Sequence, residues 1–250
     1  SEKPSDLAQN LETIKKESLS PVTRSARPAA GTAAALTAPS DEGQAKLRES
    51  YDGKAYQETV RLADEILARD PANAPAQEYL KKARAEILAS QVAPLLQSGI
   101  SNYAGGNYAQ CSLDMEKVLR IDKDNKEAQK YLFQADTSLA KPEITALIDR
   151  HRVAEENKDL LTVLSHFSSP ALADSLQAEY RLLFNGYDGI KSNISKVSIS
   201  FASRSSATAA YSQLLTAVYK KTGQRKIVFE GQKTWQLRRQ GRDWKISAVQ

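Results

Sequence analysis

Residues 234–248 read TWQLRRQGRDWKISA, and this stretch decides the fold of the C-terminal part of the chain. Its large apolar side chains fall at every second position on both sides of Gly241. Such alternation is typical of half-buried strands, and a glycine between two such runs is typical of a hairpin turn. The segment therefore predicts two antiparallel strands, with these side chains on the buried face: Trp235, Leu237, Trp244 and Ile246.

Two more alternating runs precede this hairpin. In the first, apolar side chains from Val197 to Phe201 alternate with serine and alanine, and the second covers residues 207–219. Gly223 offers a turn before the next run. We therefore expect an antiparallel sheet of four strands that starts near Ser192.

The residues before this sheet have a helical period. Apolar side chains from Ile144 to Ala154 fall on one helical face together with His151, and a second helical run ends at Gly186 and Gly189. Helices followed by strands, rather than alternating with them, favour an α+β domain.

Three helical segments followed by a sheet, with Trp235 and Trp244 flanking the last hairpin, resemble the nuclear-transport-factor-2-like family of SnoaL-like and ketosteroid-isomerase-like proteins. The resemblance covers about residues 142–250 and implies an α+β cone with a curved antiparallel sheet. This fold hosts enzymes, ligand binders and assembly modules alike. The resemblance implies a ligand pocket inside the cone, for which the candidate lining residues are His166, Tyr180, Tyr187, Phe201, Tyr211 and Trp235.

Catalytic groups are harder to assign. Enzymes of this family use a carboxylate base and acidic hydroxyl donors inside the cone. No Asp or Glu falls clearly on an inward strand position, and we expect Glu155 and Asp159 to be solvated. His151 is expected to be a packing residue with one satisfied nitrogen. The sequence predicts no catalytic residue and no cofactor, and one cysteine with two histidines argues against a metal site.

The N-terminal half contains an internal repeat. Residues 56–76 and 108–128 share a tyrosine, an apolar pair ending in leucine 11 residues later, and an aspartate three residues after that leucine. This pattern resembles the helical hairpins of tetratricopeptide repeats over about residues 41–141. The chain is therefore expected to be an α+β multidomain protein, with all-α hairpins before the α+β cone.

The two matching segments are offset by 52 residues, whereas tetratricopeptide units repeat every 34. The excess equals about five helical turns, so one helix can be longer without rotating its buried face. We therefore predict one long helix over residues 74–103 and a further helix over residues 126–139.

Composition divides the chain into three parts. Residues 1–40 form a segment rich in alanine and proline, expected to be a flexible linker with net charge +1. Residues 41–141 carry −2, and residues 142–250 carry +6. No apolar stretch approaches the ~20 residues that a membrane-spanning helix needs.

The leading functional hypothesis is a non-catalytic interaction or scaffolding protein. Its helical repeats would bind a protein partner or peptide, and its C-terminal domain would bind a ligand or form a homodimer through the sheet. The first alternative is a small-molecule binder or an isomerase-like enzyme that uses the cone pocket.

The second alternative is a binder of an anionic polymer through basic hairpins, although nucleic acid is not expected as a partner because few aromatic residues accompany the cations. The compartment is not determined by the sequence. The linker favours an extracytoplasmic place, periplasmic or tethered to a bacterial cell envelope, over the cytoplasm. The candidate anionic-partner patch consists of Arg225, Lys226, Arg238, Arg239 and Arg242.

Overall fold

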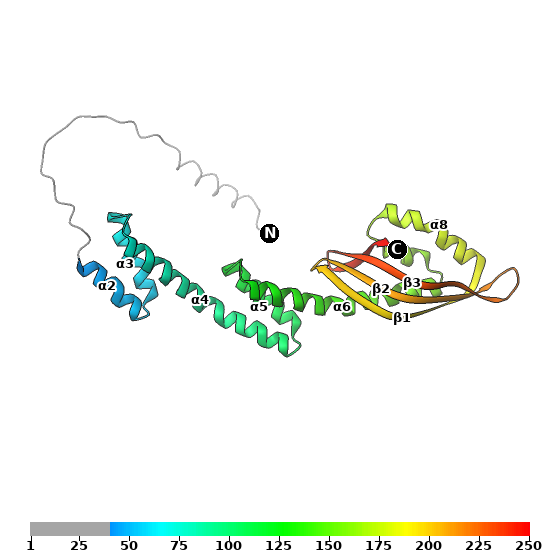
Figure 1. Cartoon of the computed structure of the whole chain (residues 1–250). Coiled ribbons are helices and arrows are strands. Elements are labelled where there is room, and N and C mark those ends of the chain that lie inside the picture. The colour runs from blue at the N-terminus through cyan, green and yellow to red at the C-terminus, as the bar shows by residue number, and fades with distance from the viewer. Residues whose placement is uncertain (1–40) are drawn as a thin grey trace, which may run out of the picture. The chain divides into compact units, whose positions relative to one another are not determined.

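The computed structural model describes residues 41–250, in which helices precede an antiparallel sheet (Figure 1). The helices are α2 (Asp41–Asp52), α3 (Tyr56–Arg69), α4 (Ala74–Ala104), α5 (Tyr108–Ile121), α6 (Lys126–Glu156), α7 (Leu160–Ser165) and α8 (Pro170–Gly186). The strands are β1 (Tyr187–Ser203), β2 (Ser206–Tyr219), β3 (Arg225–Gln240) and β4 (Asp243–Val249). The predicted α+β architecture is confirmed.

The internal repeat is present as repeated backbone geometry. The residues that precede α3 and α5 share the same dihedral angles, φ −82° and ψ 59°. Helices α4 and α6 each begin at an asparagine cap, where Asn73 accepts from the Ala76 amide at 3.1 Å and Asn125 accepts from the Ala128 amide at 3.0 Å. The two segments therefore form the same turns although their sequences are only similar, with Ala55 before α3 and Asn107 before α5.

Each repeat also packs three tyrosines from three successive helices, with ring centroids 5.4 to 5.6 Å apart. These edge-to-face and tilted contacts join the helices within a repeat. The tyrosines, each offset by 52 positions from its counterpart, are Tyr51, Tyr56 and Tyr79 in the first repeat and Tyr103, Tyr108 and Tyr131 in the second.

The two long helices, α4 and α6, have 31 residues each. Helix α4 ends one residue beyond the predicted range. The helix predicted over residues 126–139 continues to Glu156, which corrects that boundary. Pro142 lies inside α6 and removes one backbone hydrogen bond, but Ile144 and Leu147 beyond it are completely or almost completely buried. Helix α6 therefore serves both the second repeat and the C-terminal domain, and the domain boundary predicted at residues 141/142 falls within it.

The sheet is a simple antiparallel meander in the order β1-β2-β3-β4. Strand β1 begins at Tyr187, opposite Tyr219, so the predicted start near Ser192 is wrong by five residues. Gly189 has φ +54°, and the register shifts between Asp188 and Lys191, so the strand continues through an irregularity that interrupts its alternation.

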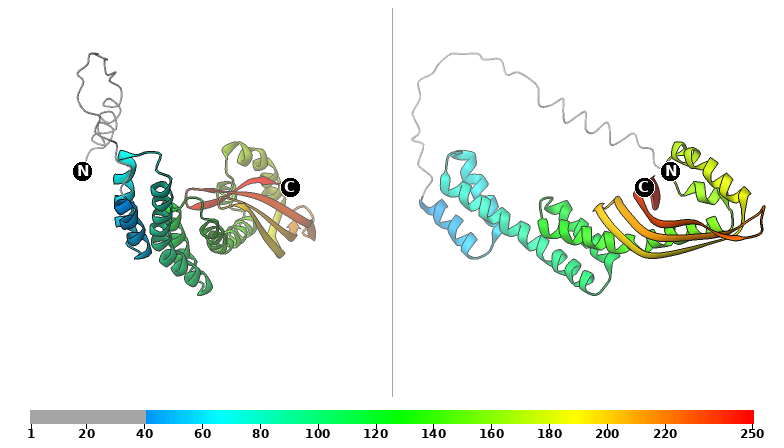
Figure 2. Two further views of the ribbon diagram at one scale, coloured as in Figure 1. Left: turned by 60° about the vertical axis from the view of Figure 1, so that its left-hand side comes forward. Right: turned by 45° about the vertical axis from the view of Figure 1, so that its right-hand side comes forward.

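One face of the sheet is buried. On β2 the alternate positions from Ala207 to Ala217 point to this face. The sheet curves around α6, α7 and α8, which supply the other side of the core (Figure 2). Trp235 and Trp244 are both buried there, as the alternation predicts. This α+β arrangement agrees with the predicted cone and leaves one interior face on which side chains can converge.

Within residues 41–250, none of the helices contains an apolar stretch long enough to cross a lipid bilayer.

Candidate active site

Helix α6 places two titratable side chains on its buried face. His151 and Glu155 are one turn apart, and each is 3% exposed. The expectation that Glu155 would be solvated is therefore wrong. Glu155 lies seven positions after Ile148 and 11 after Ile144, so it continues the apolar stripe that packs against the sheet.

The Glu155 carboxylate is surrounded by donors from three other places in the domain. Its Oε2 accepts from Nε2 of Gln213 on β2 at 3.0 Å. Its Oε1 accepts from the Tyr180 hydroxyl of α8 at 3.4 Å and lies 3.9 Å from Nζ of Lys233 on β3. Nε2 of His151 is 3.6 Å from the same Oε1. The two oxygens therefore differ: Oε1 faces cationic and hydroxyl groups, and Oε2 faces an amide.

Glu155 remains a carboxylate despite its burial. Burial by itself would raise the pKa of a carboxyl group, but the hydrogen bond and charge of His151, the charge of Lys233 and the amide of Gln213 together lower the pKa of Glu155 below its usual value. A buried ionised carboxylate is a strong acceptor because few water molecules compete for it.

His151 uses both ring nitrogens. Nε2 lies 3.0 Å from the Tyr180 hydroxyl oxygen, and Nδ1 lies 3.2 Å from Nδ1 of His166. The prediction that only one nitrogen would be satisfied is wrong. Because the Tyr180 hydroxyl donates to Glu155, it accepts from His151, so Nε2 carries a hydrogen.

His166 and Tyr180 stay uncharged at neutral pH. Burial, followed by the charges of His151, Arg150 and Lys245, lowers the pKa of His166 to about 4. Burial and the neighbouring Glu155 carboxylate raise the pKa of Tyr180 far above its usual value. Tyr180 is therefore a hydrogen-bond donor throughout the physiological range.

The structure brings together four of the six predicted ligand-binding residues. His166 and Tyr180 contact His151 directly. The Trp235 ring packs against His151 with centroids 4.9 Å apart, and Tyr211 packs against Trp235 at 5.1 Å.

The other two lie elsewhere. Tyr187 packs against Tyr219, with ring centroids 5.4 Å apart, and Phe201 packs against Trp244 at 6.1 Å. Their positions on β1 place them nearer its two ends, away from the contacts of Glu155.

Sequence analysis missed Glu155, Gln213 and Ser192 as site residues, and it placed His151 on the buried face only as a packing residue. For His151 and Glu155 the signal was available, since a spacing of four on an apolar face places both side chains inward. Gln213 lies on the buried positions of β2, where alternation could have found it. Ser192 had no such signal, because the irregularity in β1 hides its direction.

A hollow of about 340 Å³ lies between α6 and β1, beside this cluster. Ser192 connects the two, because its side chain is buried and its Oγ accepts from Nε2 of Gln213 at 2.7 Å. The same Gln213 nitrogen donates to Glu155. The lining residues are Thr145, Ile148, Asp149 and Arg152 on α6, and Ser192, Asn193, Ile194 and Val197 on β1.

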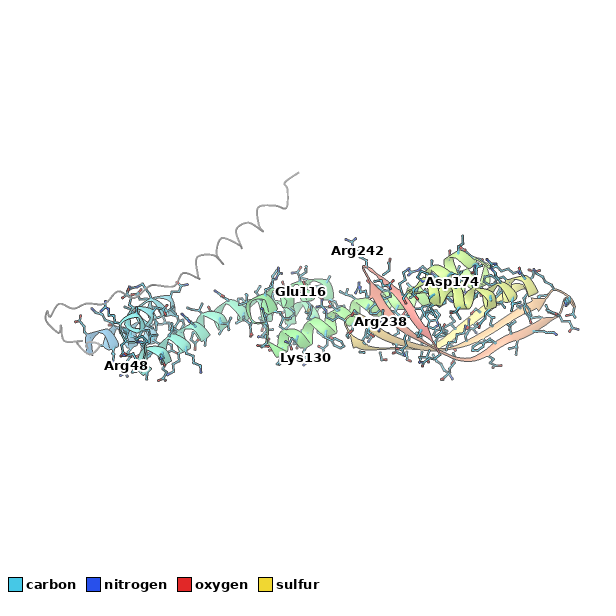
Figure 3. The ribbon with its side chains drawn as sticks, turned by 90° about the horizontal axis from the view of Figure 1, so that it is seen from above. Arg48, Glu116, Lys130, Asp174, Arg238 and Arg242 are labelled. Carbon is cyan, nitrogen blue, oxygen red and sulfur yellow. The ribbon has the colours of Figure 1, made fainter. Side chains whose placement is uncertain are left out.

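The candidate anionic-partner residues do not form one patch. Arg225 and Lys226 begin β3, and Arg238 and Arg239 lie near its other end, about 40 Å away along an extended strand. Arg242 lies in the β3–β4 turn near Arg238 (Figure 3). The five candidate residues therefore fall into two separate groups at opposite ends of β3.

No protein-family model matches this chain, and no curated protein matches it. Several solved structures are similar to part of it. One is described as a putative scytalone dehydratase from Novosphingobium aromaticivorans, with 14% identity, a TM-score of 0.43, and coverage of 46% of this chain and 85% of that one.

Two others have similar statistics. A hexachlorocyclohexane dehydrochlorinase (LinA) Type2 has 14% identity and a TM-score of 0.41, and the match covers 46% of this chain and 86% of that one. A putative dehydratase from the NTF2-like family of Streptomyces avermitilis has 15% identity and a TM-score of 0.39, with coverage of 43% and 92%. At this level of similarity, the names assign no activity to this chain.

The leading hypothesis from the sequence, a non-catalytic scaffold, is corrected. Its premise was that the domain holds no catalytic constellation. That premise fails, because Glu155 points into the domain and contacts a tyrosine and a histidine.

Proposed function

We propose that the C-terminal domain is an isomerase-like enzyme that moves a proton on a small organic molecule. The observation that carries this proposal is the buried and ionised Glu155 carboxylate, which the Tyr180 hydroxyl and His151 hold in position. A positioned carboxylate of this kind is suited to general-base chemistry.

The two oxygens of the Glu155 carboxylate have different roles in this proposal. Tyr180, His151 and Lys233 hold Oε1 and fix the orientation of the carboxylate. Gln213 is the hydrogen-bond partner that residues 41–250 provide for Oε2, and it links this oxygen to Ser192 at the hollow. Oε2 is therefore the atom we assign as the base.

The proposed reaction begins with removal of a proton from a carbon next to a carbonyl group. The proton goes to Oε2, the C–H electron pair forms the enolate double bond, and the carbonyl π pair moves to its oxygen. The substrate must also carry a C=C bond at the β and γ carbons, so that the enolate is a dienolate. The protonated Glu155 then returns the proton to the γ carbon, the α–β double bond forms and the oxygen pair re-forms the carbonyl group, which completes a double-bond isomerisation.

The substrate site that fits this chemistry is the hollow between α6 and β1. Its volume of about 340 Å³ is at the small end of the usual range for ligand pockets. Ser192 lines this hollow and Glu155 does not, so the reaction requires that the substrate enter past Ser192 and bring its acidic C–H against Oε2.

A carbon-acid probe tests the proposal without knowledge of the natural substrate. Removal of the C3 hydrogen of 5-nitrobenzisoxazole breaks its N–O bond, forms a nitrile and releases a coloured phenolate. We expect the full chain to accelerate this reaction and the Glu155→Gln variant to lose at least about 100-fold of the acceleration.

Asp174→Asn is the matched control, because Asp174 is an exposed carboxylate on α8. This variant should keep the wild-type rate. Equal rates for wild type and Glu155→Gln, with both variants shown to be folded by circular dichroism, would refute the assignment of Glu155 as the base.

The helical half carries a separate proposal about architecture. We propose that the two helical pairs are tetratricopeptide-like units and that the protein divides near residues 40 and 141. The repeated turns and tyrosine clusters support this proposal. Limited proteolysis of the full chain should cleave first near residues 40 and 141, and early cleavage inside α3, α4 or α5 would contradict it.

A further inference from the structure

We infer that Gln213 and Ser192 recognise a hydroxyl group on an uncharged substrate bound in the hollow between α6 and β1. This inference rests on the proposed function, because it names the substrate class of the same site. The observation behind it is that the side-chain oxygen of Gln213 has no hydrogen-bond partner among the described residues.

Oε1 of Gln213 is buried and has no hydrogen-bond partner among the described residues. The side-chain amide cannot be turned over to satisfy it. Nε2 donates to the Glu155 carboxylate at 3.0 Å and to Ser192 Oγ at 2.7 Å, so a reversed amide would place its oxygen against a carboxylate. An unsatisfied buried acceptor costs about 1–3 kcal/mol, so the site favours an incoming donor.

Ser192 supplies the complementary group. Its backbone amide donates to Oε1 of Glu156 at 2.8 Å, which fixes this part of β1 against α6. Its Oγ accepts from Gln213, and no contact within residues 41–250 uses its hydroxyl hydrogen. Ser192 lines the hollow, and Gln213 lies directly behind it. A free donor at the wall of the hollow is therefore followed, one residue deeper, by a free acceptor that a ligand group reaches by entering past Ser192.

A ligand hydroxyl satisfies both groups at once. It accepts a hydrogen bond from the Ser192 hydroxyl and donates one to Oε1 of Gln213. A methyl group or an ether oxygen in the same place would leave Oε1 unsatisfied. The pair is therefore suited to an alcohol, an enol or a phenol.

The charges in the hollow indicate that the ligand is uncharged. Arg152 is paired with Asp149 at 2.7 Å and with Glu156 at 3.2 Å, so its guanidinium charge is already compensated. The apolar side chains of Ile148, Ile194 and Val197 provide the rest of the contact surface. With the available volume of about 340 Å³, the ligand class is a hydroxylated molecule of one or two rings.

Two probes of nearly equal shape test this inference. 4-Hydroxyacetophenone and 4-methylacetophenone differ only in a hydroxyl or methyl group on the ring. We expect titration of the full chain, followed by NMR, to show at least about tenfold tighter binding of the hydroxyl probe, because a site built for a hydroxyl rejects the analogue that lacks it.

Three variants test whether Gln213 and Ser192 are the residues that recognise the hydroxyl group. Gln213→Met and Ser192→Ala should each abolish or strongly reduce the preference for the hydroxyl probe. Asn193→Ala, which changes another residue that lines the hollow, is the matched control and should keep the preference. Equal affinity of the wild type for both probes would overturn the inference, as would an unchanged preference in Gln213→Met.

A second measurement covers the case in which Gln213→Met does not fold. In the wild type, the side-chain amide resonances of Gln213 should shift on addition of the hydroxyl probe and not on addition of the methyl probe. No selective shift would overturn the inference.

The failures of the two proposals can be told apart. If the hydroxyl preference is present but Glu155→Gln leaves the carbon-acid reaction unchanged, recognition stands and the proposed function fails. If the reaction depends on Glu155 but the wild type has no hydroxyl preference, the proposed function stands and this inference fails.

Discussion

Nδ1 of His151 lies 3.2 Å from Nδ1 of His166, so one of these nitrogens carries the hydrogen between them and the other accepts it. Two hydrogens or two lone pairs at this distance would repel each other. Since Nε2 of His151 donates to Tyr180, a neutral His151 accepts at Nδ1, and a cationic His151 donates there. The pair thus connects the charge of the Glu155 cluster to the protonation state of His166.

The first prediction concerns stability against pH. The pKa of His166 is lowered to about 4 in the folded protein, from 6.5 in the unfolded chain. Between these values the unfolded chain binds a proton that the folded protein does not, so the free energy of unfolding falls as pH decreases from 6.5 to 4. The loss is at most about 3 kcal/mol and is complete near pH 4.

Urea denaturation of the wild type and His166→Gln across this range measures the effect. The carboxylates titrate in both proteins, so the difference between the two curves isolates His166. Parallel curves would show that the histidine pair does not carry the proton linkage.

The second prediction concerns the pH dependence of the carbon-acid reaction. The hydrogen bond and charge of His151 help to lower the pKa of Glu155. In His151→Gln the pKa of Glu155 should rise, and the acid limb of the rate profile should move to higher pH. Tyr187→Phe, at a tyrosine that lies outside the cluster, should leave the limb in place.

The third prediction concerns the cost of losing the carboxylate. In Glu155→Leu, the buried donors of Tyr180, Gln213 and His151 lose their common acceptor. We expect the free energy of unfolding to fall by about 3–5 kcal/mol, because the remaining charge and donors are left buried without a partner. The change Asp174→Leu, at an exposed residue, should lower the free energy of unfolding by less than about 0.5 kcal/mol. Similar losses of stability in both variants would show that Glu155 is not the shared acceptor of a buried hydrogen-bond cluster.

The fourth prediction concerns the equality of the repeats. Asn73 and Asn125 cap α4 and α6 through the same bond, at 3.1 and 3.0 Å. Replacement of either by alanine should lower the free energy of unfolding by about 1 kcal/mol. Replacement by serine, which keeps the accepting oxygen and adds no charge next to Asp70 or Asp122, should cost much less. Chemical denaturation of the four variants measures this, and a cap that can be removed without loss would contradict the equivalence of the two turns.

The sequence by itself determined the local architecture of this protein. The match between residues 56–76 and 108–128 predicted the repeat, and the length of α4 followed from the 52-residue offset. The alternation around Gly241 predicted β3, β4 and the burial of both tryptophans. These features depend on helix and strand periods, caps and turns, which neighbouring residues specify.

Only the tertiary structure decided which side chains meet. Glu155, Tyr180 and Gln213 come from α6, α8 and β2, and they converge because α6 and α8 pack onto the buried face of the sheet. The same geometry separated Arg225 from Arg238, which the sequence treated as one patch. Whether these side chains meet depends on strand register and on helix packing between segments that are far apart in the sequence. Residue spacing along the chain does not specify these long-range contacts.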